Sequence, residues 1–170
     1  MLYVRNVMST PAITIGMDDM LYKVREIFEE THFHHLPVVE NNKLCGIVSD
    51  RDLLRALSPG LGTLSESERD TRTLKKRAHQ IMSRYPVVLY PEQPLKEAIS
   101  LFHEHGFSCF PVVNLAFKPV GMLSWRDVMR LFYESVSSQS EPESGAETAK
   151  KSNAISESLA PKRSDSPMWL

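Results

Sequence analysis

Two short stretches of the chain place glycine, serine, arginine and aspartate in the same order after an apolar run. The first, Gly46 to Asp52, reads GIVSDRD, and the second, Gly121 to Asp127, reads GMLSWRD. Glycine in a strand lets another backbone or a ligand approach closely. The serine and the aspartate stand where a following helix would begin, and backbone N–H groups and the helix dipole favour an anion there.

These residue types suit a nucleotide. A carboxylate one turn into a helix can accept two hydrogen bonds from a ribose diol, and an adjacent arginine suits a phosphate. The candidate residues are Ser49, Arg51 and Asp52 in the first copy and Ser124, Arg126 and Asp127 in the second. The alternative is that each serine and aspartate only caps its helix. Two copies of the same set favour the nucleotide site.

The two stretches belong to a longer internal repeat. Pro37-Val38-Val39 returns 74 residues later as Pro111-Val112-Val113, and Val7-Met8-Ser9 returns at the same spacing as Ile81-Met82-Ser83. The glycine and the aspartate return after 75 residues, so the second hairpin is longer by one residue. Such a repeat indicates two similar supersecondary units, each of which packs on its twin.

Apolar periodicity and turn residues predict a β-α-β-β-α order in each unit. The expected elements of the first unit are a strand over Pro11–Ile15, a helix from Met20 to about Thr31, strands over His34–Val39 and Leu44–Val48, and a helix over Arg51–Leu57. Asp18 or Asp19 is expected to cap the first helix, Ser49 or Asp50 the second. The turn between the paired strands is expected at residues 40–43.

The second unit repeats this plan. We expect a strand over Pro86–Tyr90, a helix that opens over Pro91–Pro94 and has Gly106 just beyond its last turn, strands over Phe110–Val113 and Val120–Leu123, and a helix from Arg126 to about Ser135. The predicted organisation is a first repeat over residues 1–58, a charged linker over 59–78 and a second repeat over 79–135. Residues 136–170, rich in Ser, Glu, Pro and Lys, are expected to be a disordered tail.

The amino-acid composition argues against some classes of function. The chain has 170 residues, of which 42% are hydrophobic, and a net charge of −1. This balance gives no electrostatic case for binding nucleic acid or a membrane surface. The N-terminal residues show no signal peptide or spanning segment, so a cytoplasmic location is expected. Cys45 and Cys109 lie in predicted strands as small buried hydrophobes, not as a disulfide framework.

The chain resembles a tandem pair of CBS domains, a Bateman module, over about residues 1–135. The resemblance rests on the two β-α-β-β-α units, the Pro-Val-Val strands and the motif Gly-hydrophobic-x-Ser-x-x-Asp in both copies. It implies an α/β fold with pseudo-two-fold symmetry and two clefts for adenine nucleotides or S-adenosylmethionine. It further implies that the motif aspartate binds ribose and that backbone of the first strands, near Ile13 and Val87, lines the adenine pocket.

The resemblance also bears on the residues that precede the Pro-Val-Val strands. In the sensor subunit of the AMP-activated kinase, a member of this family, basic residues at these positions approach phosphate across the repeat interface. Here the positions hold His34 and His35 in the first copy and Ser108 and Cys109 in the second. We therefore expect unequal clefts, with the Asp127 cleft binding phosphate more strongly than the Asp52 cleft.

A metal site is the rival interpretation of the histidines. His32, His34 and His35 lie close together in the sequence, and histidine is a frequent metal ligand. Neighbouring residues of a strand point to opposite faces, however, and no paired acidic or cysteine ligand stands nearby. No metal site is assigned, although a metal sensor remains a third hypothesis.

No set of nucleophile, base and orienting group is apparent, so the chain is not expected to be an enzyme or to require a cofactor. The leading hypothesis is a regulatory module that binds AMP, ADP, ATP or S-adenosylmethionine and signals occupancy to an unidentified protein partner. The rival is a structural dimerisation module with empty clefts. A homodimer is expected because the helices carry more apolar residues than one stripe can bury, namely Leu53, Leu54, Leu57, Val128, Leu131 and Phe132.

Overall fold

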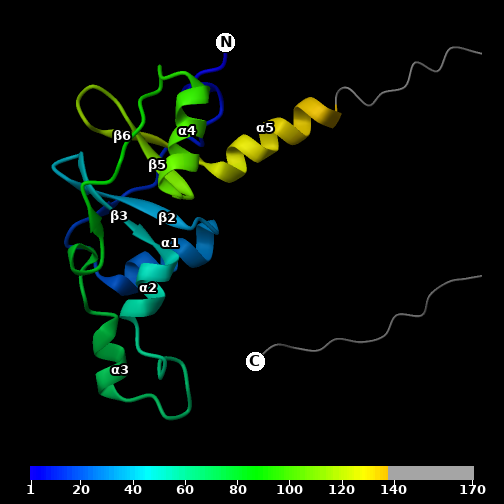
Figure 1. Ribbon diagram of the computed structural model, residues 1–170. Helices are drawn as coiled ribbons and strands as arrows, with labels where there is room; N and C mark the ends of the chain where they lie inside the picture. Colours follow the sequence, from blue (N-terminus) through cyan, green and yellow to red (C-terminus); the bar gives the residue numbers. More distant parts are fainter. Residues whose placement is uncertain (138–170) are drawn as a thin grey trace, which may run out of the picture. The chain divides into compact units, whose positions relative to one another are not determined.

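The computed structural model describes residues 1–137 (Figure 1). One sheet has the strand order β1 (Ile15–Gly16), β2 (His35–Glu40), β3 (Lys43–Ser49) and β4 (Ser83–Arg84), and a second contains β5 (Cys109–Val113) and β6 (Pro119–Ser124). The helices are α1 (Leu21–Thr31), α2 (Asp50–Ala56), α3 (Glu68–Thr73), α4 (Leu95–His105) and α5 (Trp125–Ser137). This mixed α/β fold with two repeats confirms the predicted fold class. The tail prediction lies outside the described residues from 138 onward.

The predicted helices form where the apolar stripes place them. α1 buries Leu21, Val24 and Phe28, and α4 ends at Gly106, which is left-handed with φ 65°. The prediction that Asp18 or Asp19 caps α1 is wrong, because Met20 is the residue at that position and no side chain caps it. Asp19 instead closes the preceding turn, since its carboxylate accepts a hydrogen bond from the Gly16 N–H at 2.8 Å.

The first hairpin turns through two asparagines with left-handed backbones, Asn41 at φ 49° and Asn42 at φ 63°. Turns of this kind match the twist of the flanking strands, and asparagine tolerates the conformation better than most residues. The second hairpin has the predicted extra length and includes a left-handed Phe117. The Phe117 carbonyl accepts a hydrogen bond from the Leu44 N–H at 2.9 Å, which joins the two repeats.

The first strand of each repeat is shorter than predicted. Of the segment Pro11–Ile15 only Ile15 enters β1, where it pairs in parallel with Val38. The segment Pro86–Tyr90 forms no strand, and its one pairing is a parallel bridge from Leu89 to Val112. Both predictions overestimate strand length because a proline at the head of each segment has no N–H to donate to a ladder.

The segment that precedes each repeat, its lead-in, pairs with the sheet of the other repeat. Ser9, ahead of the first repeat, pairs with Met122 of β6 through hydrogen bonds of 2.8 and 2.9 Å. Ser83, ahead of the second repeat, pairs with Ile47 of β3. Each sheet is therefore completed by a segment that precedes the other repeat in the sequence.

The two hydrophobic cores follow this exchange. The first core is built on β2 and β3 and includes Ala78 and Met82 from the lead-in of the second repeat. The second is built on β5 and β6 and includes Val4 and Val7 from the N-terminus. Because neither core is complete without the opposite lead-in, we expect the two repeats to unfold together.

Gly46 and Gly121 are the points at which the lead-ins cross the sheets. A Cβ at Gly121 would lie 2.8 Å from the Ser9 carbonyl oxygen and 2.9 Å from the Met8 sulfur. A Cβ at Gly46 would lie 2.5 Å from the Met82 sulfur and 3.0 Å from the Ser83 carbonyl oxygen. These are distances that a side chain does not tolerate without movement of its neighbours. The motif glycines therefore admit another backbone, one of the two uses considered for them.

The predicted linker contains α3, of which no residue is buried. Cys45 and Cys109 are not joined in a disulfide, and each cysteine is only partly buried. Within residues 1–137 no helix is long and apolar enough to span a membrane.

Candidate functional site

The first motif copy forms a capping box at the start of α2. The Asp52 carboxylate oxygen Oδ2 accepts hydrogen bonds from the Ser49 N–H at 2.9 Å and the Ser49 hydroxyl at 2.6 Å. The Asp52 N–H in turn donates to the Ser49 hydroxyl at 3.2 Å. This is the arrangement that satisfies the free N–H groups of a helix N-terminus. Among the described residues no hydrogen bond reaches the second oxygen, Oδ1.

The second motif copy repeats the box at the start of α5. Asp127 Oδ2 accepts from the Ser124 N–H at 2.8 Å and the Ser124 hydroxyl at 2.6 Å. Here Oδ1 has partners as well: the Ser9 hydroxyl and the Arg130 guanidinium, each at 3.3 Å. Asp127 is only 9% exposed. The two aspartates thus share one geometry, but Asp127 is the more enclosed.

A third serine–aspartate box shows that the Ser-x-x-Asp pattern can act as a helix cap outside the two motif copies. In α3, outside the two motif copies, Asp70 Oδ2 accepts from the Ser67 N–H at 2.8 Å and the Ser67 hydroxyl at 2.6 Å. A Ser-x-x-Asp cap is therefore a general helix start in this chain. What distinguishes the other two copies is the preceding strand with its glycine and the lead-in that crosses it.

His34 is tied to the helix start of its own repeat. Its Nδ1 lies 2.7 Å from Asp50 Oδ2, and its carbonyl accepts a hydrogen bond from the Asp50 N–H. Partial burial would raise the pKa of Asp50, but the hydrogen bonds from His34 and from the Arg51 N–H outweigh it and hold the pKa below its usual value. Trp125 takes the place of Asp50 in the second repeat, where its N–H donates to the Ser108 carbonyl.

His35 stands at the junction of the repeats. Its Nε2 lies 3.5 Å from the Ser108 hydroxyl of the second repeat. Burial lowers the pKa of His35, and nearby Asp50 and Asp52 counter this only in part. Burial, together with Asp127, raises the pKa of the Cys109 thiol to about 12. The charge with the largest effect on His35 is therefore Asp50, and on Cys109 it is Asp127, each from the same repeat.

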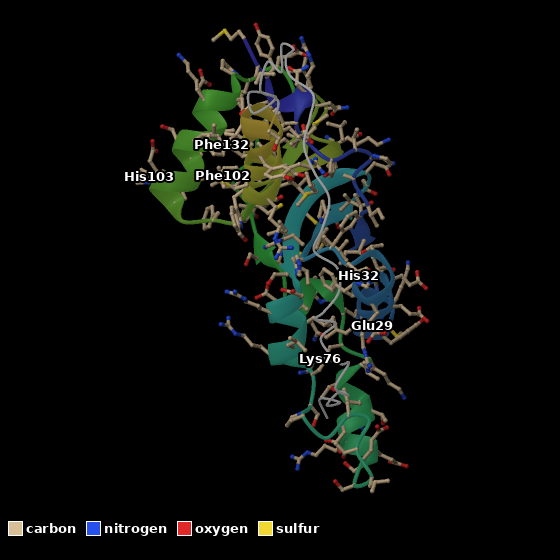
Figure 2. The ribbon with its side chains drawn as sticks, turned by 90° about the vertical axis from the view of Figure 1, so that its right-hand side faces the viewer. Glu29, His32, Lys76, Phe102, His103 and Phe132 are labelled. Carbon is tan, nitrogen blue, oxygen red and sulfur yellow. The ribbon has the colours of Figure 1, made fainter. Side chains whose placement is uncertain are left out.

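The described residues line an open cavity of about 830 Å³ beside α1 and α2. Its lining includes the apolar Phe28, Leu53 and Leu57 and the polar His34, Asp50 and Arg126. His34 and Arg126 come from different repeats, so the cavity brings together two of the predicted site residues across the junction. Figure 2 shows the side chains of Glu29 and His32, which also line this cavity.

The remaining predicted site residues do not gather at this cavity. Ile13 and Val87 occupy equivalent positions, and each is 37% exposed. They do not line the cavity, nor do Asp52 and Asp127. The structure thus gives several partial groupings and leaves the roles of these residues as predictions.

Sequence reasoning assigned no role to two residues at the second motif, Ser9 and Arg130. Arg130 follows Asp127 by one helical turn, a spacing that permits an ion pair. Ser9 was visible as part of the repeated Val-Met-Ser and Ile-Met-Ser segments, but its partner is 118 residues away. Only the exchange of the lead-ins brings the two together.

The partly buried His35 predicts a pH effect on stability. Because the folded state lowers the pKa of His35 below the 6.5 of a free histidine, the unfolded chain binds more protons as pH falls through about 6.5. The free energy of unfolding should therefore be highest above this pH and decrease toward pH 5. Urea unfolding of the wild type and of His35→Gln at pH 7.5 and 5.5 measures the effect.

His35→Gln should lose less stability between the two pH values than the wild type. The matched control is His103→Gln, since His103 is exposed on α4 (Figure 2) and should leave the wild-type decrease unchanged. An equal decrease in the wild type and in His35→Gln would show that His35 is not the group responsible.

Metal binding has no support from side-chain geometry within the described residues. No three His, Cys, Asp or Glu side chains gather closely enough there to hold an ion. The closest groupings are pairs, such as His34 with Asp50.

Comparison with known proteins identifies both repeats. The model of the CBS domain matches residues 4–59 and again 78–134. A CBS domain-containing protein of Dictyostelium discoideum is 32% identical over 130 residues, which are 75% of this chain and 89% of that protein. An L-aspartate semialdehyde sulfurtransferase of Methanocaldococcus jannaschii is 26% identical over 130 residues, but the match spans only 23% of that enzyme.

Solved structures show the same arrangement. CBSX2, a CBS-pair protein of Arabidopsis thaliana crystallised in complex with AMP, has 25% identity and a TM-score of 0.66 over 80% of this chain and 99% of its own. The CBS domain pair of protein MJ0100, crystallised with 5′-methylthioadenosine and S-adenosyl-L-methionine, has 24% identity and a TM-score of 0.65. That match covers 79% of this chain and 98% of the pair.

Proposed function

Because this chain belongs to the CBS domain family and carries the domain as a tandem pair, we propose that it is a regulatory module for adenosyl ligands. The module binds AMP, ADP, ATP or S-adenosylmethionine between its repeats and signals occupancy to a protein partner. The observation that carries the proposal is the duplicated motif, in which capping employs one oxygen of each aspartate. The complexes of CBSX2 with AMP and of MJ0100 with two adenosyl compounds support the ligand class.

Ribose recognition would use Oδ1 of each motif aspartate, the carboxylate oxygen that does not take part in the helix cap. A ribose offers two neighbouring hydroxyl donors, and an ionised carboxylate accepts through both oxygens. Asp52 Oδ1 has no partner among the described residues, so a ribose would add a bond there without breaking one. Asp127 Oδ1 has bonds of 3.3 Å to Ser9 and Arg130, long enough to be exchanged for shorter ones.

Phosphate recognition rests on Arg126, which has no ion pair within residues 1–137 and lines the cavity together with His34. His34 is paired with Asp50 at 2.7 Å and would have to exchange that contact for the phosphate. An arginine forms charge-assisted, bidentate hydrogen bonds with phosphate, and a protonated histidine adds another. We therefore propose that the cleft of Asp127 holds the phosphate of a nucleotide. The cleft of Asp52, with Ser108 in place of a histidine, would favour adenosyl ligands without phosphate.

Calorimetric titration tests the ligand class. The full chain is titrated in separate experiments with AMP, ADP, ATP, S-adenosylmethionine and 5′-methylthioadenosine, and with zinc. Saturable binding of at least one adenosyl compound supports the proposal, and zinc binding alone would favour the metal sensor. Guanosine monophosphate, which keeps the ribose and phosphate but changes the base, reports whether adenine is recognised.

A structural module with empty clefts is the second candidate. It is favoured by the Ser67–Asp70 box, which has the same geometry as the two motif copies outside the repeats, and by the enclosed position of Asp127. Under this alternative the aspartates act only as caps. Replacing them would then lower the free energy of unfolding without changing the affinity for any adenosyl compound.

A further inference from the structure

The last helix of the first repeat is much shorter than that of the second, and the chain that follows it lines the open cavity beside α1 and α2. α2 ends at Ala56 after seven residues, and Leu57 is already extended, with φ −83° and ψ 152°. In the second repeat α5 runs for 13 residues, to Ser137. Where α5 continues as a helix, the first repeat therefore has a non-helical segment, residues 57–61, as one wall of the cavity.

Hydrogen bonds to α3 hold this wall in place. The Ser58 hydroxyl donates to Asp70 Oδ1 at 2.5 Å, and the Ser58 N–H donates to the Thr73 hydroxyl at 3.2 Å. The same Ser58 hydroxyl accepts a hydrogen bond from the Gly60 N–H at 3.2 Å. α3 buries none of its own residues, so what it contributes to the first repeat is the position of this wall.

Half of the residues that line the cavity are phenylalanine, leucine or proline. Phe28 and Leu53 at the helices are buried, whereas Phe33 and Leu54 are 43% and 71% exposed. These exposed apolar side chains are not covered by any other part of the described chain. An apolar ligand would remove them from water, which is the main source of affinity for such a surface.

The charged side chains of the cavity are paired with one exception. Arg25 Nε lies 2.7 Å from Glu29 Oε1 on α1 (Figure 2), and His34 Nδ1 lies 2.7 Å from Asp50 Oδ2. Arg126 lines the same cavity from the second repeat and has no ion pair within residues 1–137. The cavity therefore combines an apolar lining with one positive charge that is not neutralised.

We propose that this cavity binds an amphipathic carboxylate of medium chain length. Its apolar chain would lie against α1, α2 and residues 57–61, and its carboxylate would bind Arg126, whose guanidinium matches a carboxylate bidentately. The volume of about 830 Å³ is within the range of small-molecule sites. The site is separate from the proposed adenosyl clefts, because neither Asp52 nor Asp127 lines it.

The two proposals meet at Arg126, which is also the residue proposed for the phosphate of a nucleotide. An acid and AMP should therefore each weaken the binding of the other, and by the same factor. 5′-Methylthioadenosine, which has no phosphate, should leave the affinity for the acid unchanged. This arm rests on the proposed function. If AMP binds but does not weaken the acid, Arg126 does not hold phosphate, and the acid site itself stands.

The test of the acid site is a calorimetric titration of the full chain without nucleotide, so its outcome does not depend on adenosyl binding. The probes are octanoate and decanoate below their micelle concentrations, with octanol and octylammonium as controls of equal chain length. Decanoate should bind roughly five- to fifteenfold more tightly than octanoate, from two further buried methylene groups. Octanol should bind at least about tenfold more weakly than octanoate, because it lacks the charge for Arg126. Octylammonium should not bind.

Substitutions of exposed residues locate the site. Arg126→Gln should raise the dissociation constant of decanoate about tenfold or more, whereas Arg55→Gln, the same change outside the cavity on α2, should not. Leu54→Gln should raise it roughly three- to tenfold, and Met129→Gln, at the equivalent position of α5, should leave it unchanged. All four variants should unfold as cooperatively as the wild type.

Three results would overturn the proposal. The first is a wild type that binds neither acid, which would leave a protein segment as the occupant of the cavity. The second is an alcohol that binds as tightly as the acid of equal length, since no cation would then be involved. The third is wild-type affinity for decanoate in both Arg126→Gln and Leu54→Gln, which would place the acid elsewhere on the chain.

Discussion

Asp127→Ala should weaken the binding of AMP by about 1–3 kcal/mol, the contribution of a hydrogen bond to a charged partner. This corresponds to a rise in the dissociation constant of roughly 5- to 150-fold. The expectation follows from the geometry of the second motif, in which Oδ2 is held by the cap and Oδ1 is available for ribose by exchange. Asp52→Ala should cost less for AMP, because Arg126, the arginine proposed for phosphate, precedes Asp127 directly in the sequence.

The chain offers a control for this substitution. Asp70→Ala removes a similar box from α3, in which the aspartate accepts from the N–H and hydroxyl of its serine, but at a helix outside the two motif copies. All three variants should lose helix-cap stability on the order of 1 kcal/mol, and Asp70→Ala should lose more because it also breaks the hydrogen bond from the Ser58 hydroxyl to Asp70 Oδ1. Only Asp52→Ala and Asp127→Ala should alter ligand affinity.

The ligand series separates ribose from phosphate. For 5′-methylthioadenosine, which has no phosphate, Asp52→Ala should cost at least as much as Asp127→Ala. Equal losses of AMP affinity in the two variants would contradict unequal clefts. Unchanged affinity in both would contradict the assignment of the motif aspartates to ribose.

Gly121→Ala should destabilise the fold by about 1–3 kcal/mol, as expected for an added methyl group in a space without room. The new Cβ would meet the Ser9 carbonyl oxygen at 2.8 Å, and this oxygen cannot move aside without breaking its hydrogen bond from the Met122 N–H. Gly46→Ala should cost less, because its nearest contact is the sulfur of the flexible Met82 side chain. Chemical unfolding of the wild type, Gly121→Ala and Gly46→Ala measures both effects.

Gly16→Ala is the control for the glycine series. Its Cβ would have only ordinary contacts, the nearest at 3.6 Å to the Asp19 carboxylate, so its stability should stay close to that of the wild type. Wild-type stability in Gly121→Ala would contradict the crossing of the lead-in over β6.

Local patterns predicted the elements well because their causes are local. The stripe of Leu21, Val24 and Phe28 determines the buried side of α1, and the two asparagines determine the turn of the first hairpin. The repeated motif predicted Ser49 or Asp50 as the cap of α2, and Ser49 is the cap. These features need only a few neighbouring residues.

The exchanged lead-ins depend on contacts that the sequence does not display. Nothing in Val7-Met8-Ser9 indicates that Ser9 pairs with Met122 and not with the hairpin that follows it. The glycines were the available signal, because a conformationally ordinary glycine in a strand implies close approach by another group. The identity of that group, a backbone and not only a ligand, required the tertiary structure.

The site residues could be assigned only in part from the sequence, because their roles also depend on contacts between distant residues. A Ser-x-x-Asp pattern cannot distinguish a cap from a binding site, as the Ser67–Asp70 box shows. His34 and His35 were grouped by sequence, yet His34 joins Arg126 at the cavity while His35 lies by Ser108. Neighbours along a strand face opposite sides, so their surroundings are set by different parts of the fold.

Titration of the wild-type chain and of Asp52→Ala with Asp127→Ala, with AMP and with S-adenosylmethionine, decides whether this module binds adenosyl ligands through its motif. The wild type should bind at least one of the two saturably and unfold at a higher temperature in its presence. The double variant should remain folded, with both effects lost. A wild type that unfolds cooperatively but binds neither compound, or a double variant that binds as the wild type does, would contradict the proposed function.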